Sequence, residues 1–354
     1  MAGTGPHHAV REDWLALACE DVIAPGQPIL DAHHHLWDRP EGRYRATEFR
    51  GDVEAGHDVR ASICVQCRTG YRPGGPTAMQ PVGEVETILD WCRDQPLHPA
   101  GIVAFADLQL GSRVRPILEA LTLAGSGHVR GIRNTTAYHP DPVVRSNPRP
   151  APDGLLRSDA FREGCTLLNE HGLCLDIWAY RTQLAEVVEL ARALPDLAII
   201  VDHCGGPLGV GPFRREDPEN FRAWRDSLAS VAELPNTRIK IGGFGLSVMG
   251  YSYAEAAIPP HSRNLAADWE PFVATCIELF GTGRAMFESN FPVDKGQFAY
   301  RTLWNAFKRL TASLDRTARD DLFWKSASRC YGIDEQIFTI KQGSKVNRPV
   351  FTGG

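Results

Sequence analysis

Three consecutive histidines follow a short apolar run in the stretch LDAHHHLWD, residues 30–38. Side chains alternate faces along a β-strand, so His33 and His35 project to one side while His34 projects to the other. Two imidazoles about 7 Å apart along one strand are able to share a divalent ion, because neutral imidazole nitrogen binds zinc, iron and manganese. The spacing predicts a metal site at the end of this strand, with His34 packed against a helix.

Two later segments add donors of the same kind. His203 ends the run IIVDHCGGP before a Gly-Gly-Pro turn, and Glu288 and Asn290 share one face of the stretch FESNFPVD. If these segments are strands of one closed sheet, their side chains converge at a common opening with the first pair of histidines. The predicted metal ligands are His33, His35, His203, Glu288 and Asn290.

Other polar side chains stand near strand ends. Arg133 in GIRN and Lys240 in RIKIG are able to hold a substrate carboxylate or polarise a carbonyl. Asp176 shares a strand face with Trp178 and Tyr180, and inside a barrel it would need Lys240 or Arg133 as a cationic partner. The predicted substrate-binding residues are Arg133, Trp178, Tyr180 and Arg181, whereas His139 is expected to be a solvated loop residue.

The elements that must position these residues form a repeating pattern. Short apolar runs alternate with segments of helical period, as in a parallel sheet built from βα units. The predicted strands cover 28–36, 61–68, 101–108, 129–135, 173–180, 197–204, 237–244 and 284–291. Eight strands over about 260 residues match the ~250 typical of a (β/α)8 TIM barrel, which is the fold class predicted here.

The rest of the chain is expected to flank this single barrel. We predict an N-terminal extension at 1–28 with an extra helix over 10–23, the barrel at 29–335 with a closing helix over 315–332, and a C-terminal tail at 336–354. Two long segments, 137–156 and 244–264, follow the fourth and seventh strands. Barrel enzymes build their sites from loops at this end of the strands, so both segments are candidates for the site's surroundings.

Composition excludes several classes of partner. The net charge is −5 and no dense basic run occurs, so a nucleic acid or an anionic membrane surface is not expected to bind. No stretch is apolar enough for a membrane span, and the N-terminal residues do not form a signal peptide, which predicts a cytoplasmic protein. The nine cysteines form no disulfide framework, and the Cys64–Cys67 CxxC pair is expected to be buried core, with zinc or redox work as the alternative.

The motifs resemble those of the amidohydrolase-related family. DAHHHLWD is similar to the family's first-strand D-x-H-x-H segment, and IVDHCGGP and MFESNFPVD are similar to its sixth- and eighth-strand motifs, over about residues 29–332. The family includes sugar-lactone and pyrone-dicarboxylate lactonases and metal-dependent decarboxylases. The resemblance implies a substrate-binding role for Arg133, although the histidine that follows this arginine in relatives is Asn134 here, and Arg181 stands where relatives often have histidine.

One departure from the family concerns the proton acceptor. Hydrolases of the family usually read G-S-D-W-P on the eighth strand, and the position of that aspartate is Asn290 here. An amide cannot accept a proton in the working pH range. Glu288 on the same face, or Asp294 four residues on, is therefore the predicted base.

Three functions remain open on the sequence. The first is a metal-dependent hydrolase of a small carboxylate-bearing lactone or amide, using zinc or manganese and a metal-activated water, with Glu288, Asp294 and Lys240 as catalytic residues. The second is a dinuclear iron or manganese monooxygenase, as some proteins resembling this family are, with a reductase partner. The third is a non-catalytic subunit of an active paralogue. A small-molecule substrate and a homo- or hetero-oligomer are expected.

Overall fold

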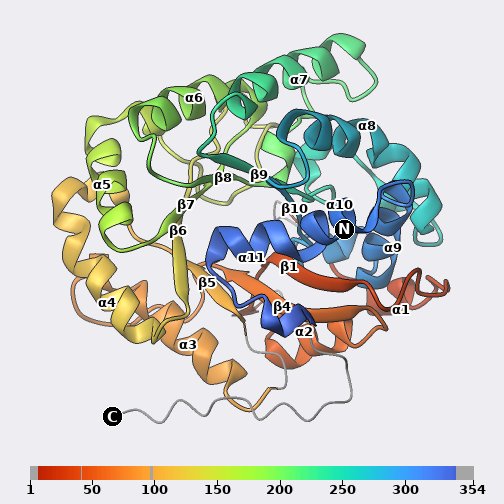
Figure 1. The fold of residues 1–354 in the computed structure, drawn as a ribbon, viewed down its shortest axis with the longest axis horizontal. Coiled ribbons are helices and arrows are strands. Elements are labelled where there is room, and N and C mark those ends of the chain that lie inside the picture. Colours follow the sequence, from red (N-terminus) through yellow and green to blue (C-terminus); the bar gives the residue numbers. More distant parts are fainter. Residues whose placement is uncertain (1–6, 41, 96–98, 340–354) are drawn as a thin grey trace.

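Eight parallel strands form a ring at the centre of the protein (Figure 1). The computed structural model describes residues 7–40, 42–95 and 99–339. In sheet order, which is also chain order, the strands are β1 Pro28–His34, β4 Asp58–Val65, β5 Gly101–Ala104, β6 Val129–Thr135, β7 Cys174–Trp178, β8 Ile199–Val201, β9 Thr237–Ile241 and β10 Ala285–Phe287. All eight predicted strands are present, and several end earlier than predicted at their carboxyl ends.

The ring is joined where the first and last strands meet. The amide N of Asn290 donates to the carbonyl of His33 at 2.8 Å, and the amide N of His35 donates to the carbonyl of Phe291 at 2.7 Å. His34 and Phe291 form a parallel bridge there. The predicted (β/α)8 barrel is confirmed, and its seam runs through the histidine motif and the eighth-strand motif.

Helices surround the sheet (Figure 1). A short hairpin, β2 Trp37–Arg39 and β3 Gly42–Tyr44, follows the first strand. The helices are α1 Glu12–Leu15, α2 Ala46–Val53, α3 Val82–Cys92, α4 Arg115–Gly125, α5 Asp159–Glu170, α6 Leu184–Ala193, α7 Pro218–Ala232, α8 Ser262–Phe280, α9 Tyr300–Leu310, α10 Arg316–Asp320, α11 Ser326–Tyr331 and α12 Gln336–Thr339.

Local sequence signals explain where the helices begin. Ser158 caps α5 by accepting from the amide N of Phe161, and Asp217 caps α7, whose first residue is Pro218. On its inner face α7 buries Trp224 and Leu228. A polar cap followed by an apolar stripe of helical period is the pattern that a helix packed on a sheet requires.

The helix predicted over residues 10–23 is wrong in extent. Only Glu12–Leu15 is helical, because the residues that follow bond to the barrel's outer helices instead of to one another. Glu20 accepts from the amide N and hydroxyl of Ser262, and the amide N of Ile23 donates to the side chain of Asn305. Tertiary partners for these groups replace the hydrogen bonds that a longer helix would have made.

The closing helix predicted over 315–332 is confirmed as a nearly continuous unit. It consists of α10, a π-helical turn at Asp321–Lys325, and α11. The tail from Lys341 onward lies outside the described residues. Among the described residues, the long segments after β6 and β9 contain only short 3-10 turns.

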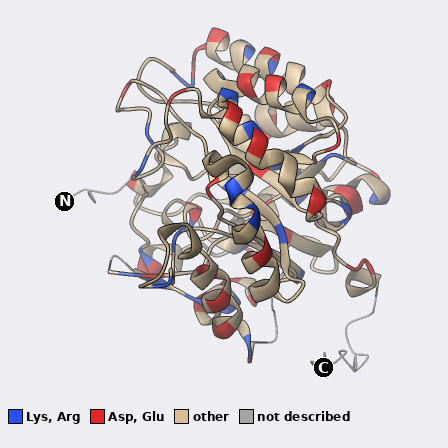
Figure 2. Cartoon of the chain, turned by 90° about the vertical axis from the view of Figure 1, so that its left-hand side faces the viewer, with Lys and Arg blue, Asp and Glu red and all other residues tan. Residues whose placement is uncertain are grey.

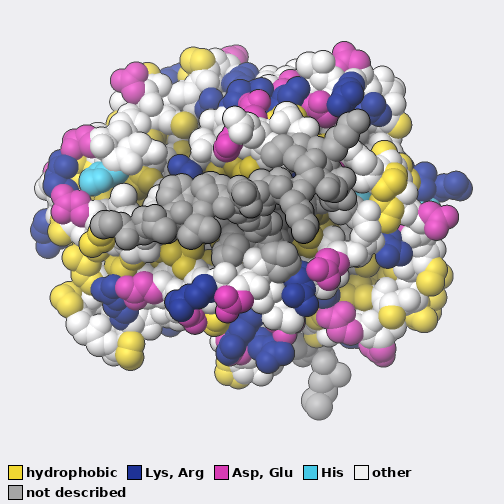
Figure 3. Space-filling model, turned by 60° about the horizontal axis from the view of Figure 1, so that its bottom comes forward, with side chains coloured by type: hydrophobic (Ala, Val, Ile, Leu, Met, Phe, Trp, Pro, Cys, Tyr) yellow, Lys and Arg dark blue, Asp and Glu magenta, His cyan; other side chains and the backbone are white. Residues whose placement is uncertain are grey.

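Acidic and basic residues are interspersed over the outer helices (Figure 2). The face drawn in Figure 3 likewise carries both signs, with apolar side chains between them. No helix in the described part of the chain has the length and apolar character needed to cross a membrane.

A buried ion pair fills the barrel beneath the histidine motif. The ammonium of Lys240, on β9, donates to Asp176 on β7 at 2.6 Å, and the hydroxyl of Tyr331 donates to the same carboxylate oxygen at 2.9 Å. Both members of the pair are fully buried. Of the two cations that the sequence suggested as the partner of Asp176, the structure shows Lys240 in that position.

We expect Lys240→Met to lower the free energy of unfolding by about 3–5 kcal/mol, because it leaves buried carboxylates without their cation. Urea denaturation followed by far-UV circular dichroism measures the loss. The double variant Asp176→Asn/Lys240→Met should lose less than the sum of its single variants, since it removes both members of the pair. A single Lys240→Met variant as stable as the wild type would contradict this account.

Candidate metal centre

The histidines of the first-strand motif point to the two faces of the sheet that their spacing predicts. Nε2 of His33 and Nε2 of His35 lie 3.2 Å apart, and both rings are almost completely buried. His34 points the other way, where it stacks on Phe49 of α2 with ring centroids 3.9 Å apart. The predicted packing of His34 against a helix is confirmed.

His203 reaches the same place from the opposite side of the sheet. Its ring centroid lies 4.8 Å from that of His33. The strand β8 ends at Val201, and His203 and Cys204 then take φ values of 54° and 56°. This turn directs the imidazole inward, and Gly243 makes room for it, because an added Cβ at Gly243 would lie 2.6 Å from Cβ of His203.

Glu288 lies between two of the histidines and is fully buried. Its Oε1 accepts from Nδ1 of His203 at 2.7 Å and from the amide N of His203 at 3.1 Å. Its Oε2 lies 3.0 Å from Nδ1 of His33. Of the predicted carboxylates, Glu288 is thus the one that the fold brings to the histidines.

Asp202 is a member of the cluster that the sequence analysis missed. Its Oδ1 lies 3.5 Å from Nδ1 of His33 and 3.2 Å from Nζ of Lys240, and its Oδ2 lies 2.8 Å from Nε of Arg133. Strand alternation would place Asp202 on the face opposite His203. Because the strand ends before them, both side chains point inward; an acid at the end of the apolar run IIVD was the available signal.

Burial and pairing decide the charge states in this cluster. Burial opposes ionisation of Asp202, yet Lys240 and Arg133 outweigh it and hold the pKa of this carboxyl well below its ordinary value. Burial likewise opposes ionisation of Glu288, but the two neighbouring histidines lower its pKa. The site therefore contains ionised carboxylates that are excluded from water.

Two of the histidines, His35 and His203, are shifted toward the neutral form. Burial lowers the pKa of His35 well below its ordinary value, and it lowers the pKa of His203 although Glu288 opposes the change. A neutral imidazole has one ring nitrogen with a free lone pair, which is the form that binds metal ions.

Asn290 and Asp294 pair with each other. Asn290 takes a φ of 54°, and its amide Nδ2 donates to Oδ1 of Asp294 at 2.8 Å. The other oxygen of Asp294 accepts from the amide N of Gly245 at 3.0 Å. Both oxygens of Asp294 are therefore occupied, and burial raises the pKa of its carboxyl well above the ordinary range.

Two aromatic residues of β7 and the turn after it form one wall of the site. Trp178 lies against His203, with ring centroids 4.7 Å apart. Ser146, from the long segment after β6, accepts from Nε1 of Trp178 at 2.9 Å and bonds the hydroxyl of Tyr180 at 2.8 Å. These bonds fasten the long segment over the carboxyl end of β7.

The remaining predicted residues lie on the rim. Arg181 donates to the side chain of Asn220 at 3.0 Å and lies over the ring of Phe213 at 4.7 Å. His139 contacts the same phenyl ring edge-on at 5.3 Å. Arg181 and His139 therefore meet at Phe213, apart from the buried cluster.

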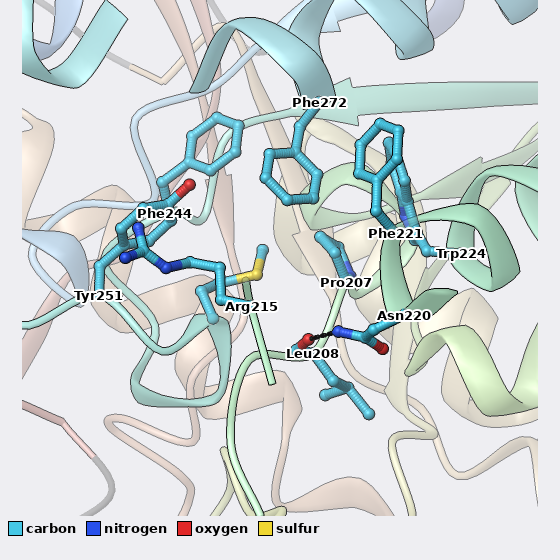
Figure 4. A pocket seen from close by; sticks show the side chains of 10 residues that line it. Pro207, Leu208, Arg215, Asn220, Phe221, Trp224, Phe244, Tyr251 and Phe272 are labelled. Atoms are coloured by element: carbon cyan, nitrogen blue, oxygen red, sulfur yellow. Dashed lines mark hydrogen bonds between the residues drawn. The ribbon is translucent and has the colours of Figure 1, made fainter. Parts of the chain in front are cut away.

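An aromatic cluster supports the loops that carry His203 and Gly243. Figure 4 shows Phe221, Phe272 and Trp224 gathered at one side, with Arg215 beside Tyr251. The pocket that they line also contacts Pro207, Leu208 and Phe244, which follow the turn after His203 and Gly243. It adjoins a groove of about 510 Å³ between α7 and α8.

The cluster has the donors that a divalent cation requires. Ligand atoms of His33, Asp202 and His203 all lie within 4.8 Å of one another. Both oxygens of Asp202 are paired with the cations Lys240 and Arg133, whereas Oε2 of Glu288 is buried with the ring of His33 beside it. Buried carboxylates beside neutral imidazoles are the surroundings that a zinc or manganese ion would stabilise. The set of five predicted ligands stays a prediction.

The cysteines of the CxxC motif are free thiols. Burial raises the pKa of both Cys64 and Cys67 above the ordinary range, so neither thiol is activated as a nucleophile.

Known proteins are similar in sequence to this chain over most of its length. The family model for amidohydrolases matches residues 30–333. An uncharacterised protein of Sinorhizobium fredii is 30% identical over 327 residues, covering 86% of this chain and 98% of that protein. The L-fucono-1,5-lactonase of Burkholderia ambifaria is 28% identical over 310 residues, covering 86% of this chain and 96% of the lactonase.

Solved structures share the fold. An amidohydrolase from Burkholderia multivorans with bound HEPES has a TM-score of 0.68 at 21% identity, covering 86% of this chain and 99% of that one. A zinc-bound form of the amidohydrolase from that organism has a TM-score of 0.65 at 20% identity, with the same coverage. At such identities the likeness supports the fold alone. The match of the family model across the barrel nevertheless decides the relationship: the chain belongs to the amidohydrolase family.

Proposed function

We propose that this protein is a metal-dependent hydrolase of a small carboxylate-bearing lactone or amide. The observation that carries the proposal is the buried meeting of His33, His35 and His203, with Nε2 of the first two 3.2 Å apart. Membership of the amidohydrolase family and the likeness to a lactonase support hydrolysis. A zinc-bound amidohydrolase of the same fold supports the choice of metal.

The three histidines would hold a single divalent ion, with Asp202 within reach of two of them. A metal ion there supplies a water of lowered pKa and a Lewis acid for the substrate carbonyl. Zinc or manganese suits these nitrogen and oxygen donors. Among the described residues, one cluster has ligand atoms spaced to hold an ion, namely His33, Asp202 and His203. A single cluster favours one metal ion over a dinuclear centre.

The chain's own residues would orient the substrate and exclude water. The guanidinium of Arg133 is slightly exposed and is already placed by Asp202, so its free nitrogens are available to a substrate carboxylate. Trp178 and Tyr180 form an apolar wall beside His203. Substrates with a carboxylate or several hydroxyls beside the reacting carbonyl match these surroundings.

We expect the purified, metal-stripped protein to regain lactone hydrolysis on addition of about one equivalent of Zn²⁺ or Mn²⁺. Elemental analysis gives the stoichiometry, and a pH-indicator assay with a panel of sugar lactones gives the activity. His33→Ala should lose more zinc affinity than the roughly 10–100-fold caused by loss of an outer partner of a ligand. His34→Gln, on the opposite strand face, is the matched control and should bind zinc normally.

Two bound iron or manganese ions per chain, with oxygen consumption in place of lactone hydrolysis, would contradict the hydrolase and favour the oxygenase alternative. A protein that binds no metal and gains activity only with a paralogue would favour the subunit alternative.

Gly243→Ala should weaken zinc binding and destabilise the protein by about 1–3 kcal/mol, the cost of a strained backbone position. Gly243 has a φ of 70°, and an added Cβ would press on the ring and Cβ of His203. Isothermal titration with Zn²⁺ and thermal denaturation measure the two effects. The control is Gly51→Ala, where an added Cβ meets nothing within 4 Å; unchanged zinc affinity in Gly243→Ala would show that the position of His203 is unimportant.

A further inference from the structure

Glu288, which the sequence predicts to be a base or a metal ligand, contacts two histidine rings and one backbone amide in the structure. Its two oxygens face two imidazole rings: Oε1 lies 2.7 Å from Nδ1 of His203, and Oε2 lies 3.0 Å from Nδ1 of His33. The carboxylate also accepts from the amide N of His203 at 3.1 Å. An ionised carboxylate only accepts hydrogen bonds, so Nδ1 of His203, which it bonds, must carry a proton.

The third histidine has its proton placed in the same way by the backbone. Nδ1 of His35 lies 2.8 Å from the carbonyl oxygen of Val65, which likewise only accepts. A neutral imidazole protonated at Nδ1 has its free lone pair at Nε2. His35 and His203 therefore present Nε2 to a ligand.

His33 is the ring whose proton position is contested. Nζ of Lys240 lies 3.2 Å from its Nδ1 and can only donate, which favours a proton on Nε2. Oε2 of Glu288 lies closer to the same nitrogen, at 3.0 Å, and can accept a hydrogen bond from it only when that nitrogen carries the proton. Moving the proton to Nδ1 would satisfy this buried oxygen and free the Nε2 lone pair, 3.2 Å from Nε2 of His35.

We propose that Glu288 is a positioning residue that keeps the ring protons of His203 and His33 on Nδ1, so that both rings offer Nε2 to one shared cation. The proposal rests on the proposed function only in naming that cation. It removes Glu288 from the metal's own ligands and from the transfer of the water's proton. Outer carboxylates that bond metal-binding histidines fix the ring tautomer and orientation in this manner.

A glutamine at this position tests the proposal, because an amide cannot accept from both rings. Its oxygen would accept from one Nδ1, while its nitrogen would donate to the other and force that ring to carry its proton on Nε2. Glu288→Gln keeps the size of the side chain. Glu278→Gln, on the exposed surface of α8, removes the same charge away from the site and is the control.

The first measurement is zinc affinity, by competition between each protein and a chromophoric chelator. We expect Glu288→Gln to bind Zn²⁺ about 10–100-fold more weakly than wild type, and Glu278→Gln to match the wild type. A folded Glu288→Gln variant, verified by circular dichroism, with wild-type zinc affinity would overturn the proposal.

The second measurement is the ring tautomer, from long-range ¹H–¹⁵N correlation spectra of histidine-labelled protein. His203 of the zinc-free wild type should carry its proton on Nδ1, and zinc should bring His33 to the same state. In Glu288→Gln one of the two rings should switch to Nε2–H. A wild-type His203 with its proton on Nε2 would refute the proposal even if the variant failed to fold.

The two proposals fail separately. A wild type that binds no zinc but shows His203 protonated at Nδ1 would contradict the metal-dependent hydrolase and would still support the role of Glu288 in placing the ring proton. If the wild type binds one zinc and Glu288→Gln is unchanged in zinc affinity and ring tautomer, the metal-dependent hydrolase is supported and the role of Glu288 is contradicted.

Discussion

Charges that are withdrawn from water must be compensated where they lie, and this requirement shapes the carboxyl end of the barrel. Asp176, Asp202 and Glu288 are fully buried there: Lys240 pairs with Asp176 and Asp202, Arg133 pairs with Asp202, and Glu288 faces two histidines. A buried charge without a partner costs several kcal/mol, so these groups hold one another in place. Glu288 is paired with neither of the two cations, and its charge suits a site for a further cation.

Bringing these polar side chains to one site also requires an irregular backbone at the strand ends. Regular strands alternate their side chains, so consecutive residues cannot all face the interior. His203, Cys204 and Asn290 adopt positive φ, and these conformations occur where β8 and β10 give way to loops. The strain is tolerated because surrounding bonds fix the chain, as between Asn290 and the carbonyl of His33. Residues that are neighbours in sequence are thereby able to serve one site.

The replacement of the family's eighth-strand aspartate has a structural consequence. Asn290 bonds Asp294 and lies outside the contacts of the histidine rings, while Glu288, two residues earlier, bonds two of them. The carboxylate of this strand is therefore retained at a different position. From that position it reaches the Nδ1 side of the rings, as the positioning role proposed for Glu288 requires.

Much of the barrel followed from the sequence, because apolar runs, helical periods and helix caps are local signals. The alternation of side chains along a strand correctly predicted that His33 and His35 lie on one face and His34 on the other. The sequence also predicted that Asp176 pairs with either Lys240 or Arg133. The N-terminal helix was overestimated, since Glu20 and Ile23 bond Ser262 and Asn305, which are far away in the chain. Asp202 was missed because alternation does not hold beyond the end of a strand.

The sequence by itself determined the fold class, the family and most of the side chains able to meet at one end of the sheet, since these depend on residue type and spacing. The tertiary structure alone decided which oxygen faces which ring nitrogen, that Lys240 reaches both Asp176 and His33, and that Asp294 is occupied elsewhere. Most of those contacts join residues that are far apart in the chain, so residue type and spacing along the sequence cannot predict them.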